Sequence, residues 1–265
     1  TGCLVPAGDP HALAAAMAKA ARLSLSGEEL ALICQRAENR YIGVQSGIMD
    51  QYAIALGRKN HALFLDCRTL SYEYVPIQIK DHLLLIVDSR VERALAASAY
   101  NRRREECSEA VKMIACLTGT PLNALRDLEL SVLKQYAPHL PDPYYRRALY
   151  VLEENRRVLA ARKALNDQEL IIFGELMKAS HAGLRDLYEV SCPELDTIVD
   201  TAVAIPGVLG ARMTGAGFGG CVIVLLEKGI NRELQSSIIK AYSERRWPEP
   251  LFYETGLAEG LKIIK

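Results

Sequence analysis

The fold of this chain is decided by the stretch RMTGAGFGGCVIVLL at residues 212–226. Its glycines at Gly215, Gly217 and Gly220 have the GxGxxG spacing of a dinucleotide-binding loop. In that motif a helix must follow the glycines directly, because the first amides of the helix bind the pyrophosphate. Here the β-branched run CVIVLL follows instead, which is typical of a strand. We therefore predict a glycine loop between two strands and exclude a dinucleotide-binding fold.

The segments around this loop predict an α+β protein with mostly antiparallel strands. Three strands are expected before the main run of helices, and the third is apolar and therefore central. Because successive strands lack regular helical crossovers, a doubly wound parallel sheet is excluded. The strands are expected at 61–67, 71–77, 83–88, 221–226 and 251–254, with a further short one before the glycine loop. The helices are expected at 12–22, 27–41, 98–117, 144–165, 170–188, 193–204 and 231–245, with a looser proline-containing connection at 118–142.

Local patterns predict the ends and faces of these helices. Ser26 and Glu29 form a Ser-x-x-Glu capping box before the helix at 27–41, and Ser191 and Glu194 form a second one. Periodicity predicts that the helix at 144–165 turns one face to the core and one to solvent. The residues expected on its solvated basic face are Arg146, Arg147, Arg156, Arg157, Arg162 and Lys163.

Composition excludes several classes of partner. The chain has 32 basic and 32 acidic residues, so it lacks the basic excess that binding to nucleic acid requires. The longest apolar runs are strand-sized, well below the ~20 residues that a membrane span needs. Seven cysteines without a CxxC pair or zinc-site spacing indicate buried thiols in a reducing compartment. We therefore expect a cytoplasmic protein with no nucleic-acid or membrane partner.

The segment GVQSGIMDQ, at residues 43–51, contains one carboxylate, Asp50, among glycines, small polar residues and apolar residues. We expect Asp50 to be shielded from solvent, and a shielded carboxylate can act as a base on one positioned hydroxyl. The alternative is that Asp50 caps a helix beginning at Gln51, because aspartate is favoured at N-caps. The residues alone leave both interpretations open.

The glycine loop also has two interpretations. Its glycines allow positive φ angles, so the backbone can approach a ligand or a neighbouring loop closely. The alternative is a bend that packing alone requires. His181 lies on an apolar helical stripe with Met177 and Leu184, which favours a structural histidine. The basic run at 102–104 precedes the acids at 105–106 and is interpreted as a solvated, self-paired surface.

Several segments together resemble the galactokinases, members of the GHMP small-molecule kinase superfamily. They occur in the family's order along nearly the whole chain, at 37–51, 65–68, 98–107, 180–196 and 212–221. The resemblance implies a GHMP-kinase-like α+β fold. It comprises the remnant of an N-terminal ribosomal-S5-like α/β domain at 1–80, and a ferredoxin-like C-terminal domain with inserted helices at 81–265.

The resemblance also implies an activity: transfer of the ATP γ-phosphate to the C1 hydroxyl of galactose, as in the Leloir pathway, by a monomer that uses Mg²⁺. Asp50 corresponds to the catalytic aspartate that faces the sugar hydroxyl, Tyr100 to a tyrosine of the sugar pocket, and Glu38 to the magnesium ligand. The residues alone also allow Glu38 to be a solvated acid and Tyr100 a core aromatic. The glycine loop corresponds to the motif at the junction of nucleotide and sugar, with Gly215, Ala216, Gly217 and Gly219 at the nucleotide and Gly217 also at the sugar.

Two parts of the family pattern are missing from this sequence. The N-terminal Gly-Glu-His-Thr-Asp signature is absent, and PAGDPH at residues 6–11 replaces the glycine- and serine-rich phosphate loop. Asp9 adds a negative charge and Pro10 removes an amide donor, so this loop should bind triphosphate poorly. We expect a galactokinase core that is incomplete as this chain. The alternative is a catalytically silent galactokinase-like sugar sensor or regulatory binding protein.

Overall fold

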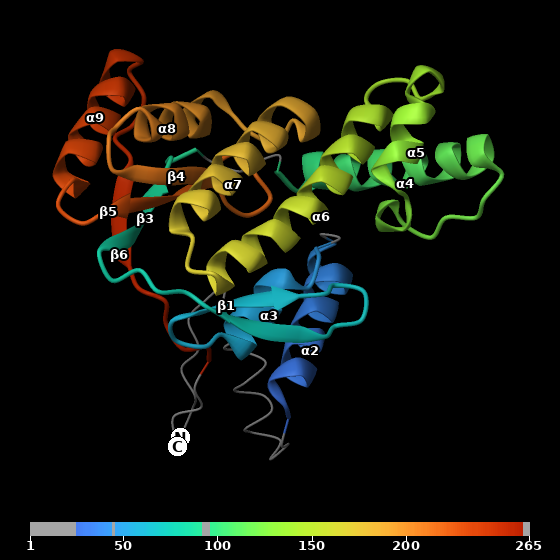
Figure 1. The fold of residues 1–265 in the computed structure, drawn as a ribbon, viewed down its shortest axis with the longest axis horizontal. Helices are drawn as coiled ribbons and strands as arrows, with labels where there is room; N and C mark the ends of the chain where they lie inside the picture. Colours follow the sequence, from blue (N-terminus) through green and yellow to red (C-terminus); the bar gives the residue numbers. More distant parts are fainter. Residues whose placement is uncertain (1–24, 44–45, 92–95, 262–265) are drawn as a thin grey trace. The chain divides into compact units, whose positions relative to one another are not determined.

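A computed structural model describes residues 25–43, 46–91 and 96–261 of the chain (Figure 1). The chain divides into two compact units, Thr1–Gln78 with Gly256–Lys265, and Ile79–Thr255. The expected helix at 12–22 and the loop at 6–11 lie outside the described residues. The expectation of domains at 1–80 and 81–265 stays a prediction. None of the described helices is long and apolar enough to cross a membrane.

The first unit pairs helices with a two-stranded hairpin. Helix α2 (Gly27–Ala37) begins at the expected capping box, where Ser26 and Glu29 exchange hydrogen bonds of 3.1 Å and 2.8 Å. The π-helical turn η1 (Glu38–Ile42) continues α2. The remaining elements are α3 (Met49–Leu56), β1 (His61–Leu65) and β2 (Tyr72–Pro76), the last two paired antiparallel as predicted. Ala31, Ile48 and Tyr52 are buried together in the core of this unit.

The second unit is built on a four-stranded antiparallel sheet. Its order is β4 (Val208–Met213), β5 (Cys221–Glu227), β3 (His82–Asp88) and β6 (Leu251–Thr255). Strand β3 lies between β5 and β6, which confirms the central position predicted from its apolar sequence.

Helices α8 (Pro193–Val203) and α9 (Asn231–Glu244) pack on the sheet and bury its alternate residues (Figure 1). The predicted second capping box is wrong, because α8 has Cys192 at its N-cap without a side-chain cap, and the Ser191 hydroxyl donates to Asp196 instead. Helix α7 (Leu170–Gly183) packs against β4 and ends in the π-helical turn η4 (Leu184–Tyr188).

The remaining helices form a cluster of their own, around α4 (Ala96–Thr118) and α6 (Tyr144–Asn166). The expected loose connection at 118–142 is more ordered than predicted: it contains α5 (Leu130–Gln135) and the short helices η2 (Leu125–Asp127) and η3 (Ala137–His139). Its leucines are buried against α4 and α6, so tertiary packing orders a segment whose prolines indicated a loop. The buried leucines are Leu125, Leu128, Leu130, Leu133 and Leu140.

Candidate functional site

Glu38 is held in a fixed position beside the segment that carries Asp50. Its half-buried carboxylate begins η1, directly after α2. The Glu38 Oε2 atom accepts a hydrogen bond of 2.9 Å from the Ser46 hydroxyl and one of 2.8 Å from the Gln51 side-chain amide. Gln51 is only 2% exposed. The structure therefore brings Glu38 and the 46–51 segment together, and Glu38 is not the freely solvated acid of the alternative interpretation.

Asp50 is exposed, so the expectation that its carboxylate is shielded is wrong for the described residues. The N-cap alternative is wrong as well, because α3 begins at Met49 and has Ile48 at its N-cap. Ile48 and Tyr52 are four residues apart on one helix face, and both are buried. That face points to the core, so the helix turns Met49 and Asp50 outward. The Asp50 side chain is therefore exposed in the part of the chain that the structure describes.

The carboxylate of Glu38 is chemically suited to Mg²⁺. Both hydrogen-bond donors reach its Oε2 atom, and no described residue donates to Oε1. Among the described residues there is no cluster of three or more His, Cys, Asp or Glu side chains that could hold a metal ion. Mg²⁺ is commonly held by one or two carboxylates together with substrate phosphates and water, so a single oriented carboxylate fits such a site.

The glycine loop connects β4 to β5, as the sequence predicted. Gly217 (φ +85°) and Gly219 (φ +125°) adopt conformations that other residues rarely adopt. A Cβ atom at Gly217 would lie 2.1 Å from the Val190 carbonyl oxygen, and one at Gly219 would lie 2.9 Å from the Val91 side chain. The Phe218 amide donates to the same Val190 oxygen at 2.8 Å. These two glycines are therefore required for close contact with neighbouring loops, and they are buried.

Gly215 and Ala216 form the accessible part of this loop. Gly215 is exposed and Ala216 is half-buried. Tyr100, on α4, is also half-buried. Burial, followed by nearby Cys107 and Tyr100, raises the pKa of Tyr188. Farther along α4, Arg103 donates to the Tyr188 carbonyl at 2.7 Å and Cys107 lies 3.7 Å from the Tyr188 hydroxyl, so the part of α4 that follows Tyr100 contacts η4. Tyr100 and the glycine loop belong to the second unit, whereas Glu38 and Asp50 belong to the first.

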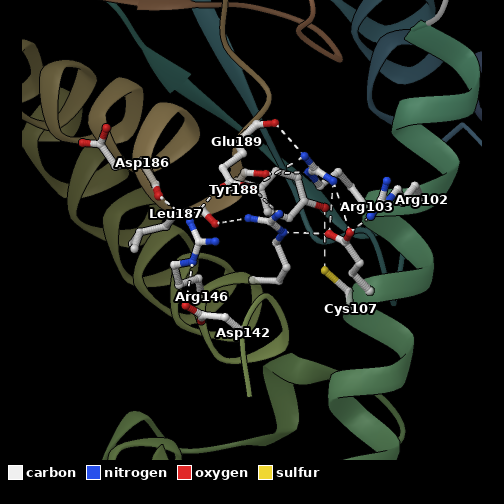
Figure 2. A network of polar contacts seen from close by, with 11 residues as sticks. Arg102, Arg103, Cys107, Asp142, Arg146, Asp186, Leu187, Tyr188 and Glu189 are labelled. Carbon is white, nitrogen blue, oxygen red and sulfur yellow. Dashed lines mark hydrogen bonds and ion pairs between the residues drawn. The ribbon is translucent and has the colours of Figure 1, made fainter. Parts of the chain in front are cut away.

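Sequence reasoning missed a polar network beside the glycine loop (Figure 2). Arg147 was expected on a solvated face but is 2% exposed. Arg103 was expected on a solvated, self-paired surface: the pairing with Glu106 is confirmed, but its side chain is only 13% exposed. Arg147 contacts Glu106 at 2.7 Å and Glu189 at 2.6 Å. Arg103 reaches Glu106 at 3.2 Å. The partners lie on α4, α6 and the end of η4, and only the spacing of Arg103 and Glu106 on one helix was visible as a signal in the sequence.

The charges of this network are compensated internally. Hydrogen bonds from Arg147 and Arg146 lower the pKa of Glu189 to about 2. Burial on its own would raise the pKa of Glu106, but the hydrogen bond from Arg147 and the charge of Arg103 outweigh it and lower that pKa. Both carboxylates are thus ionised at neutral pH, and they neutralise two poorly solvated guanidinium groups.

His181 is a structural histidine, as expected. It is 2% exposed, and its Nδ1 atom accepts a hydrogen bond of 3.3 Å from the Met213 amide. Its Nε2 atom lies 3.2 Å from Asp196 Oδ1. His181 therefore joins α7 to the end of β4 and to α8.

Comparison with protein-family models gives two matches along the chain. The model of the GHMP kinases N terminal domain matches residues 7–58, and that of the GHMP kinases C terminal region matches residues 161–244. A galactokinase of Roseiflexus sp. (strain RS-1) is 43% identical over 241 residues, which cover 91% of this chain and 61% of the relative. A galactokinase of Staphylococcus carnosus is 41% identical over 238 residues, with 89% and 61% covered.

The chain thus spans about three fifths of the length of these curated relatives. A crystal structure of Lactococcus lactis galactokinase complexed with galactose superposes with a TM-score of 0.89 at 36% sequence identity. That superposition covers 97% of this chain and 68% of the other.

Proposed function

Because this chain belongs to the galactokinase family of the GHMP kinases, we propose that the protein transfers the γ-phosphate of ATP to the C1 hydroxyl of galactose. Family membership confirms the GHMP-kinase-like α+β fold expected from the sequence. One structural observation carries the proposal further than similarity does. The Glu38 carboxylate is oriented by the side chains of Ser46 and Gln51, and Gln51 directly follows the exposed Asp50 in sequence.

The two acids take different roles in the proposed reaction. Phosphoryl transfer requires the protein mainly to position groups and to neutralise charge. With a reference pKa near ~4, an aspartate cannot remove an alcohol proton in the ground state. Asp50 accepts that proton late, as the new O–P bond forms. Glu38 would hold Mg²⁺, and the bound ion would neutralise charge on the phosphates.

The second unit supplies the proposed substrate contacts. We propose that Tyr100 contacts the sugar and that Gly215 and Ala216 contact the nucleotide, while Gly217 and Gly219 keep the loop in place at the junction of sugar and nucleotide. The accessibility of Gly215 and Ala216 supports a direct contact through this part of the loop. Gly217 and Gly219 are buried against Val190 and Val91, so they contribute by setting the shape of the loop.

The remaining features of the proposal concern the cell and the assembly. We infer a cytoplasmic monomer that acts on a small sugar, uses ATP and Mg²⁺, and binds neither nucleic acid nor membrane. The expectation of buried thiols is correct for Cys34 and wrong for Cys67 and Cys116, which are exposed.

The decisive experiment measures ADP release by the full-length protein with galactose, ATP and Mg²⁺. Asp50→Asn should lower kcat by about 10²–10⁴-fold, the range of general acid–base catalysis, without lowering the melting temperature. Asp81→Asn, at another exposed aspartate, is the matched control and should leave kcat unchanged. Stabilisation of the wild-type protein by galactose without ADP release would instead support the silent sugar sensor.

A further inference from the structure

We propose that Arg103, Arg147 and Glu189 are positioning residues for the glycine loop, acting through the turn at 187–190. Their role in the reaction rests on the proposed function, because the loop lies at the proposed junction of nucleotide and sugar. Their effect on loop position does not depend on it. Figure 2 shows the labelled Arg103 pointing from α4 toward Tyr188 and Glu189.

The two arginines bind consecutive backbone carbonyls of this turn. Arg147 Nη1 donates to the Leu187 carbonyl at 2.5 Å. Arg103 donates to the Tyr188 carbonyl at 2.7 Å through Nε and to the Glu189 carbonyl at 2.9 Å through Nη2. The helix ends here, with Glu189 in the left-handed conformation, so these carbonyls lack further helical partners. The guanidinium groups therefore fix the path of the chain where η4 stops.

Val190, the residue after this turn, connects the turn to the glycine loop through hydrogen bonds. The Val190 amide donates to the Leu184 carbonyl at 3.0 Å, and the Val190 carbonyl accepts from the Phe218 amide at 2.8 Å. Gly217 leaves no space for a side chain against the same carbonyl. The Arg103 guanidinium also lies 6.0 Å from the centroid of the Phe218 ring, within the range of a cation–π contact. A shift of the turn must therefore displace the loop or break its hydrogen bond.

The geometry requires guanidinium groups at these positions. The Nε, Nη1 and Nη2 atoms of Arg147 each bind a different partner, on Glu106, Leu187 and Glu189 respectively. A lysine keeps the charge but presents one compact ammonium group, which does not reproduce the planar set of donors. The Glu189 carboxylate completes the arrangement because it binds Arg147 and Arg146 from the turn itself.

The test uses Arg103→Lys and Arg147→Lys in the full-length protein, with Arg156→Lys as the control, because Arg156 is exposed on the same helix as Arg147. Hydrogen exchange measures the exchange rate of the Phe218 amide, and steady-state kinetics give kcat and the KM values for ATP and galactose. We expect faster exchange at Phe218 in both network variants, while the amides of α8 and α9 keep their protection. We expect kcat/KM to fall by roughly 10–100-fold, the scale of a 1 Å misplacement. The control should change neither quantity.

Unchanged exchange at Phe218 in a folded Arg103→Lys variant would overturn the proposal, and that variant decides the question if Arg147→Lys does not fold. Faster exchange with unchanged kcat/KM would overturn the role of the network in the reaction. A wild-type protein that does not phosphorylate galactose would refute the proposed function, while the exchange rate at Phe218 would still test the positioning.

Discussion

At the scale of single residues, the carboxylate of Glu189 should make the stability of the folded protein depend on pH. Arg147 and Arg146 lower its pKa from the ordinary value of 4.5 to about 2. A depressed pKa stabilises the folded state at pH values above 4.5, and this contribution is lost as the pH falls toward 2. Urea unfolding at pH 7, 4 and 2.5 should therefore show Glu189→Gln less stable than wild type at pH 7, and the difference should shrink progressively at the lower pH values.

Glu175→Gln is a suitable control, because Glu175 is 64% exposed and pairs only across one turn of α7. Its difference from wild type should be small at every pH. A Glu189→Gln deficit that is as large at pH 2.5 as at pH 7 would show that the carboxylate charge is not what stabilises the turn.

Gln51 provides a second test at this scale, for the proposed magnesium ligand. Its amide donates to Glu38 Oε2, while its buried Oε1 atom has no hydrogen-bond partner among the described residues. Gln51→Met removes the amide donor, and Glu38 Oε2 keeps the hydrogen bond from the Ser46 hydroxyl. Loss of a hydrogen bond that orients a metal ligand typically costs about 10–100-fold in metal affinity or activity. The Mg²⁺ concentration that gives half-maximal activity should rise by that factor.

Gln35→Met is the matched control, because Gln35 donates to the Ser46 carbonyl and not to the Glu38 carboxylate. It should leave the Mg²⁺ requirement near that of wild type. If Gln51→Met and Gln35→Met require the same Mg²⁺ concentration as wild type, the proposed metal role of Glu38 loses its support.

Burial of individual charged residues was the least predictable feature of the sequence. Arg146 and Arg147 are adjacent, and nothing local distinguishes them, yet Arg147 is 2% exposed and the Arg146 side chain is 32% exposed. The difference arises from Glu106 and Glu189, which are about forty residues away on either side in sequence. The prediction that Asp50 is shielded was wrong for the opposite reason. Its apolar neighbour Ile48 and Tyr52 point to the core, so the Asp50 side chain is exposed.

At the scale of helices and strands, local patterns were more informative. The capping box at Ser26 and the apolar strand β3 were predicted from a few residues, because hydrogen bonding and alternation act over short distances. The helices within 118–142 were not predicted. α5 has six residues and η2 has three, too few to be stable on local propensity alone. Their order depends on leucines buried against distant helices.

The contact between α7 and β4 gives a prediction for a pair of elements. A Cβ atom at Gly174 would lie 2.3 Å from the Leu209 carbonyl oxygen, and one at Gly210 would lie 2.3 Å from the Gly174 carbonyl oxygen. Gly174→Ala must therefore separate the helix from the strand, although alanine is the better helix former. Overpacking of this kind costs about 1–3 kcal/mol. Urea unfolding should show a loss of this size for Gly174→Ala.

Gly256→Ala is the control, because a Cβ atom there meets nothing within 4 Å. Its unfolding midpoint should stay close to wild type. A Gly174→Ala protein as stable as the control would mean that α7 and β4 lie farther apart than the structure has them.

At the scale of the whole molecule, the resemblance to galactokinases predicted the fold, but the residues alone did not predict where the last segment returns. Residues 257–261 join the first unit through backbone hydrogen bonds, with the Asn60 amide donating to the Leu257 carbonyl at 3.2 Å and the Leu261 amide donating to the Ile54 carbonyl at 2.8 Å. Backbone contacts of this kind carry no side-chain pattern that a sequence reveals. The chain therefore crosses between its two units twice, near residues 78 and 255.

Gly260 allows this return, and its replacement should destabilise one unit only. Its amide donates to the Gly57 carbonyl at 2.7 Å, and a Cβ atom at Gly260 would lie 2.7 Å from the Gly57 nitrogen and 2.8 Å from the Ile54 oxygen. Gly260→Ala should therefore release the segment and increase hydrogen exchange in α3 and β1, while α8 and α9 keep their protection. Gly174→Ala should instead increase hydrogen exchange in α8 and α9, while α3 and β1 keep their protection. Equal loss of protection in both units would mean that they unfold as one body, and no loss in α3 would mean that the returning segment does not stabilise the first unit.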